Sequence, residues 1–72
     1  MTNLRVIRES LRVSQERVSR LTNLSFNTYC RAEYGQPVRH STAMQILDAI
    51  NSILVERGKE PVTLDDLGLN LD

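Results

Sequence analysis

An apolar stripe between residues 43 and 54 constrains the fold of this chain more than any other feature. Six apolar side chains recur there at helical spacing and share one helix face: Ala43, Ile46, Leu47, Ile50, Ile53 and Leu54. A helix with so long an apolar face needs other elements to cover it. Because the chain has only 72 residues, it forms a single domain, and its remaining segments must supply that cover.

The remaining segments are also helical in pattern, and hydroxyl side chains mark where the helices begin. The expected helices run from residue 2 or 3 to 12, over 15–22, over 26–33, from a cap at Ser41 to about 57, and over 64–67. The expected N-caps are Ser14, Ser25, Ser41 and Thr63. Thr63 and Asp66 have the spacing of a capping box. No segment before the C-terminal tail has the pattern of a strand, so the predicted fold class is all-α.

Turn residues separate these helices. Gly35 with Pro37 ends the third helix, and Gly58 with Pro61 ends the fourth. Asn23 follows the second helix at a sharp turn, where we expect a positive φ, which Asn tolerates better than most residues. The alternating tail at 67–71 predicts an extended end.

Charge is divided unequally along the chain, although the net charge is zero. Residues 1–40 contain seven Arg and three Glu, whereas residues 41–72 contain two basic and six acidic side chains. This polarity would allow the first half to face an anionic partner while the second half faces away.

Several chemical classes are not expected from this composition. With one Cys and one His, the chain can form neither an internal disulfide nor a structural zinc site. We see no paired carboxylates, metal cluster or glycine-rich phosphate loop, so we expect neither an enzyme nor a cofactor. No apolar run approaches the roughly 20 residues of a membrane span, and the N-terminus lacks a signal-peptide core. These features predict a cytoplasmic protein that does not enter a membrane.

The two short helices at 15–22 and 26–33, joined by a short turn, have the geometry of a helix-turn-helix. Residues 13–35 read VSQERVSRLTNLSFNTYCRAEYG, with polar, apolar and turn positions in the register of the phage-repressor and Cro family. The chain resembles this family, also called xenobiotic-response-element-like, over about residues 4–50. The resemblance implies a five-helix, lambda-repressor-like DNA-binding domain over 1–72, encoded by a bacterium, phage or plasmid.

The register of the third helix divides its side chains between two faces. Tyr29 and Ala32 are expected to pack inward with Val18 and Leu21. The opposite face carries Phe26, Asn27, Cys30 and Arg31. In a major groove, Arg31 can pair with guanine and Asn27 with adenine, and the Phe26 ring can contact a thymine methyl group. The resemblance implies base contacts at these same four positions, although a polar residue is more usual where Phe26 stands.

Other side chains are expected to contact phosphate or to hold the motif together. Gln15 lies in the first turn of its helix, where free N–H groups favour an anion. The resemblance implies that Gln15 contacts phosphate, and the neighbouring positions suited to the same contact are Ser25, Thr28, Gln36 and Arg39. It also implies a partly buried ion pair between Arg8 and Glu33.

Each of these residues also has a simpler interpretation. Arg31 and Asn27 could be ordinary solvated side chains. Phe26 could be partly buried beside Leu24, and Cys30 could be a passive small residue.

A DNA-binding module of this size gains from pairing on a palindromic site. The fourth helix extends past Asn51, where the family often has Gly, so residues of about 50–72 carry much apolar surface. We expect a homodimer through this region, at Ile53, Leu54, Leu64, Leu67, Leu69 and Leu71. Alternatively, the tail folds back on its own core and leaves a monomer that pairs only on DNA.

The predicted function is therefore a sequence-specific regulator, a repressor that binds double-stranded DNA. An antitoxin or a restriction–modification controller would use the same domain. A different class is a protein-binding adaptor, in which the acidic half docks a partner and the motif is only scaffold.

Overall fold

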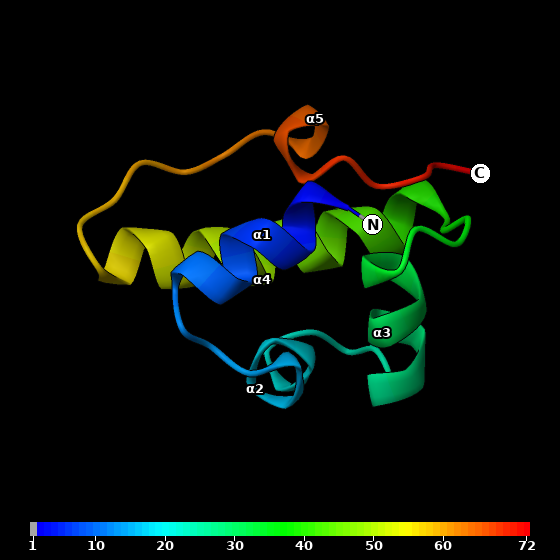
Figure 1. Cartoon of the computed structure of the whole chain (residues 1–72), viewed down its shortest axis with the longest axis horizontal. Coiled ribbons are helices and arrows are strands. Elements are labelled where there is room, and N and C mark those ends of the chain that lie inside the picture. Colours follow the sequence, from blue (N-terminus) through cyan, green and yellow to red (C-terminus); the bar gives the residue numbers. More distant parts are fainter. Residues whose placement is uncertain (1) are drawn as a thin grey trace.

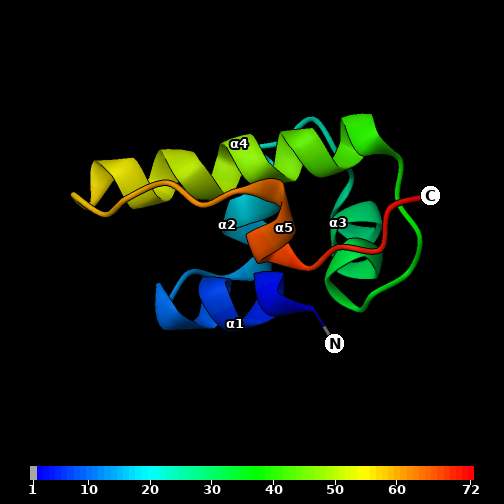
Figure 2. The same cartoon turned by 90° about the horizontal axis from the view of Figure 1, so that it is seen from above.

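The fold is organised around α4 (His40–Glu56), the longest helix of the chain. A computed structural model describes residues 2–72, which contain four further helices: α1 (Asn3–Ser10), α2 (Gln15–Arg20), α3 (Phe26–Glu33) and α5 (Leu64–Leu67). Helices α1 and α4 form a middle layer, with α5 and the tail on one side and α2 and α3 on the other (Figures 1 and 2). The chain is thus all-α, as its sequence predicts.

Side-chain caps begin three of the helices where expected. The hydroxyl of Ser14 accepts a bond from Arg17 N at 3.1 Å, and that of Ser25 from Thr28 N at 3.2 Å. Thr63 and Asp66 form a complete capping box. The expectation for Ser41 is wrong, because α4 begins at His40 and its N-cap is Arg39, which caps without a side-chain bond. The extended backbone of Arg39 starts the helix two residues before Ser41 could.

Helix α4 continues through Asn51 to Glu56, which confirms the predicted extension. The side chain of Asn51 is bonded to the segment that returns after the helix. Its Nδ2 donates to Val62 O at 3.0 Å and its Oδ1 accepts from Val62 N at 2.8 Å. Asn51 thus attaches the returning chain to α4.

The turn between α2 and α3 differs from the expectation at two residues. Asn23 does not have a positive φ. The Thr22 hydroxyl accepts from Leu24 N at 3.1 Å, and Asn23 N donates to Gln45 Oε1 at 3.1 Å, so side chains stabilise the turn without a left-handed residue. Leu21 is 53% exposed instead of packing inward, whereas Leu24 is partly buried and packs against the core.

All five helices contribute to one apolar core, which includes Leu4, Val18, Tyr29, Ala32, Ile46, Ile50 and Leu67. The expectation of an uncovered C-terminal apolar surface is wrong at several positions. Ile53, Leu54 and Leu67 are buried in this core, while Leu64 and Leu69 pack against it half-buried. Of the six leucine and isoleucine residues expected at an interface, Leu71 alone is exposed, at 44%. The tail covers these side chains by folding back over α1 and α4.

The tail ends as an extended segment, as predicted, and it joins the loop between α3 and α4. Val38 N donates to Asn70 O and Asp72 N donates to Val38 O, both at 2.8 Å, which makes one parallel bridge between Val38 and Leu71. The loop after α3 is therefore tied to the far end of the chain.

Within residues 2–72 no helix is both long and apolar enough to cross a membrane.

Candidate nucleic-acid interface

Helix α3 presents its two faces as its register predicts. Tyr29 and Ala32 are buried on the inner side. On the outer side Asn27 and Arg31 are exposed, and Phe26 is 46% exposed. Cys30 is only partly exposed, and burial raises the pKa of its thiol, so it is a poor nucleophile. This exposure is compatible with both interpretations of Phe26, a contact in the groove and a partly buried side chain beside Leu24.

A bidentate ion pair fixes α3 against α1. Arg8 Nε and Nη2 donate to Glu33 Oε2 and Oε1, both at 2.9 Å, and the side chains are only 12% and 1% exposed. This confirms the pair predicted between these residues. Two parallel charge-assisted bonds fix orientation as well as distance. The pair therefore sets how the end of α3 sits on the rest of the domain.

Burial by itself raises the pKa of Glu33, but the bonds from Arg8 and Gln15 outweigh it and hold that pKa below its usual value. The bond to Glu33 raises the pKa of Arg8. The Tyr29 hydroxyl is buried and has no hydrogen-bond partner within residues 2–72, and burial raises its pKa strongly. All three groups thus keep their charge states throughout the neutral range.

Gln15 belongs to this network, which its sequence context did not indicate. Its Nε2 donates to Glu33 Oε1 at 3.1 Å, and the side chain is half-buried. The first residue of α2 is thus held against the last residue of α3. One amide hydrogen and the amide oxygen of Gln15 make no other bond within residues 2–72, so the group can still reach outward. Sequence spacing could not have revealed this contact, since it joins two helices through a buried carboxylate.

The other expected phosphate contacts fall into two groups. Ser25 and Thr28 are occupied with each other at the start of α3, where the Ser25 hydroxyl donates to Thr28 Oγ1 at 2.9 Å. Gln36 and Arg39 lie exposed on the loop between α3 and α4. The structure thus places one group beside each end of α3.

Each of the three Glu residues within residues 2–40 forms an ion pair with an Arg. The other Arg residues of this segment therefore keep an uncompensated positive charge. Glu9 pairs with Arg5 at 2.9 Å, Glu16 with Arg20, and Glu33 with Arg8. Within residues 2–40, the arginines without an ion pair are Arg12, Arg17, Arg31 and Arg39, and all four are exposed. They lie on the loop before α2, on α2, on α3 and at the start of α4. Positive charge is thus distributed around the two motif helices.

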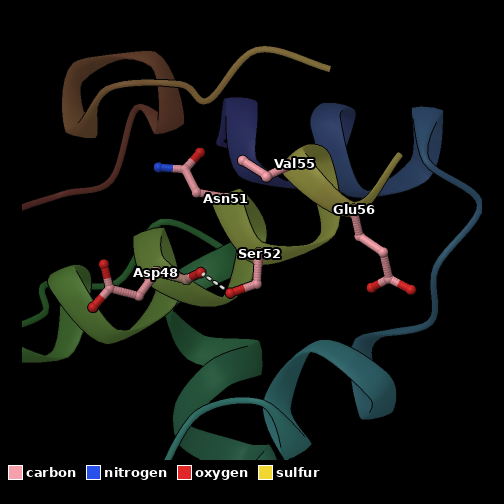
Figure 3. Close-up of a pocket in the computed structure, with 5 residues that line it drawn as sticks. All are labelled: Asp48, Asn51, Ser52, Val55 and Glu56. Atoms are coloured by element: carbon pink, nitrogen blue, oxygen red, sulfur yellow. Dashed lines mark hydrogen bonds between the residues drawn. The ribbon is translucent and has the colours of Figure 1, made fainter. Parts of the chain in front are cut away.

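The acidic half contains a shallow groove along α4, lined by Asp48, Asn51, Ser52, Val55 and Glu56 (Figure 3). The Ser52 hydroxyl donates to Asp48 O at 2.9 Å, so the helix backbone occupies it. Asn51 is bonded to Val62. Within residues 2–72, the groups of this groove that make no side-chain bond are the carboxylates of Asp48 and Glu56 and the apolar side chain of Val55.

Comparison with models of known protein families, with curated protein sequences and with solved structures finds no match for this chain.

Proposed function

We propose that this chain is a sequence-specific DNA-binding regulator of the phage-repressor and Cro type, with a lambda-repressor-like fold and α2 and α3 as its helix-turn-helix. One observation carries the proposal. The exposed side chains of α3 gather on one face, while a buried ion pair and Tyr29 fix the opposite face to the core. A helix built this way can present base-reading groups in a fixed orientation.

In this proposal the N-terminal part of α3 enters the major groove. Asn27 reads adenine and Arg31 reads guanine through paired hydrogen bonds, and the half-exposed Phe26 ring contacts a thymine methyl group. Arg17, Gln36 and Arg39 lie exposed around α3 and contact phosphates, and these contacts set affinity without adding sequence information. Such binding weakens as salt rises, because each phosphate contact releases counterions.

The burial of Ile53, Leu54 and Leu67 bears on how two copies would pair. Since these side chains stabilise the core of one chain, they are not free to form an interface. We therefore favour a chain that is monomeric in solution and pairs on a palindromic operator, with half-sites about 34 Å apart. Repression would follow where two bound copies block a promoter. Antitoxins and restriction–modification controllers use DNA in the same way.

The test is to select duplexes from a random pool and then measure affinity for the enriched sequence. We expect a palindromic site, and we expect Arg31→Ala to relax preference at one base pair per half-site with a loss of about 1–3 kcal/mol. Lys59→Ala, which removes a cation from the acidic half, is the matched control and should leave affinity and sequence unchanged. Failure to enrich any sequence would refute the proposal.

An adaptor is the second candidate function, favoured by the groove on α4. Its two free carboxylates, Asp48 and Glu56, flank the exposed side chain of Val55, which would suit a basic partner helix. A protein partner that binds tightly to a chain without DNA affinity would support it. In that case Val55→Glu should abolish partner binding, whereas Arg31→Ala should not affect it.

A further inference from the structure

Arg12 has a backbone conformation that its residue type does not favour. Its φ is +57°, and within residues 2–72 no other non-glycine residue has a positive φ. An L side chain is strained in this left-handed region because Cβ approaches the neighbouring carbonyl, whereas glycine is not. The position thus favours glycine, yet the chain has arginine.

The strain comes from the way α1 ends. Arg12 N donates to Glu9 O at 3.0 Å and Val13 N donates to Arg8 O at 3.4 Å, which is the bonding pattern of a Schellman motif. Arg8 Nη1 holds Val13 O at 2.8 Å, and the Arg57 guanidinium donates to Leu11 O. Neighbours on both sides of Arg12 are thus fixed, and its backbone cannot relax.

The Arg12 side chain gains nothing from the fold that would offset this strain. It is exposed, and within residues 2–72 it makes no hydrogen bond or ion pair. The acids nearest along the chain, Glu9 and Glu16, are paired with Arg5 and Arg20. A strained residue whose side chain makes no stabilising contact within the chain suggests that the side chain contacts a binding partner.

The place of Arg12 indicates which role. It lies three residues before Gln15, at which α2 begins and whose amide contacts Glu33 at the end of α3. We propose that Arg12 is an additional phosphate-binding residue, held rigidly beside the helix-turn-helix, and that this contact compensates for its strained backbone. The inference rests on the proposed DNA-binding function and names a contact that the family resemblance does not imply.

Three substitutions separate the strain from the charge. Arg12→Gly removes both, Arg12→Ala removes the charge and keeps the strain, and Arg12→Lys keeps both. Each phosphate contact contributes about 0.9 to the slope of log affinity against log salt. Between 50 and 200 mM salt, the Gly and Ala variants should therefore lose about 3.5-fold less affinity than the unmodified chain. The Lys variant should keep the original slope, and all three should select the same sequence.

Unfolding by urea supplies the second measurement. The midpoint should rise for Arg12→Gly and change little for Arg12→Ala and Arg12→Lys. Lys59→Ala is the control for loss of a cation and should leave the salt slope unchanged.

The outcomes distinguish this inference from the proposed function. If the unmodified chain binds DNA and Arg12→Ala keeps its full salt slope, the phosphate contact is refuted and the regulator stands. A midpoint that does not rise in Arg12→Gly refutes the strain argument. A chain that binds no DNA at all overturns both proposals.

Discussion

The two halves of the molecule are held together by different kinds of interaction. Around α3, a buried carboxylate receives bonds from α1 and α2 through Arg8 and Gln15. Around α4, by contrast, the returning chain packs through apolar side chains such as Leu67, with Asn51 as its polar attachment. Directional bonds fix how a helix is oriented, whereas apolar packing mainly adds stability. The polar network lies where the proposed function needs a fixed helix face.

The largest effect should come from breaking the polar network. Glu33→Ala leaves Arg8 buried without its partner, and we expect a loss of about 3–5 kcal/mol in the free energy of unfolding. Glu9→Ala removes a carboxylate from an exposed pair and should cost below about 1 kcal/mol. Urea denaturation of both variants makes the comparison. Similar losses in the two would show that burial gives the Arg8–Glu33 pair no special weight.

A cavity in the apolar packing around α4 should lower the free energy of unfolding nearly as much. Leu67 is completely buried in α5, so Leu67→Ala should cost about 2–4 kcal/mol. Leu64→Ala, at a half-buried position of the same helix, is the control and should cost less. Since α5 packs on both α1 and α4, hydrogen exchange should also increase in those helices. An unchanged midpoint for Leu67→Ala would mean that α5 is dispensable for the fold.

A third variant tests the polar attachment within the apolar half. Asn51→Ala removes both bonds to Val62 and leaves its backbone groups without partners, at an expected cost of about 1–2 kcal/mol. Ser52→Ala changes an exposed neighbour on α4 and should be close to neutral. If the two variants unfold at the same urea concentration, the attachment contributes nothing measurable.

The sequence predicts those helix starts that depend on bonds between residues close along the chain. The starts of α2, α3 and α5 could be predicted because Ser14, Ser25 and Thr63 act through bonds within a few residues. The start of α4 could not, since Arg39 caps it without a side-chain bond. The preference of Asn for a positive φ predicts that conformation at Asn23, in the turn after α2, where it does not occur. It occurs instead at Arg12, where the hydrogen bonds that end α1 impose it.

Long-range contacts account for the remaining differences. The family resemblance predicts the Arg8–Glu33 pair, whereas the contact of Gln15 with Glu33 depends on the spatial arrangement of α1, α2 and α3. The apolar tail pattern of Leu67 and Leu69 suits either an intermolecular interface or a fold-back. Only the path of the chain over α1 and α4 decides between them (Figure 2).

Acid should weaken the polar network around α3 before it weakens the apolar packing around α4. The folded-state pKa of Glu33 lies below its ordinary value of 4.5. Its stabilising contribution is therefore complete above about pH 4.5 and is lost as the pH falls toward the folded-state pKa. Glu33→Gln should remove this part of the pH dependence of unfolding. If that variant kept the whole acid-induced loss of stability, other carboxylates would be responsible for it.

The smallest effects on stability are expected at Val55 and Leu71, which keep exposed side chains in the half that is otherwise apolar and closed. Leu71→Ser and Val55→Ser should each change the free energy of unfolding by less than about 0.5 kcal/mol, because neither leaves a cavity. Because these substitutions should leave stability nearly unchanged, they test the oligomeric state separately from the fold. In sedimentation equilibrium at micromolar concentration, the unmodified chain should behave as a species of 8.2 kDa, and neither substitution should alter that. A stable dimer that either substitution dissociates would contradict the monomer in solution. It would also show that the dimer interface includes the exposed side chain, Val55 or Leu71, whose substitution dissociates it.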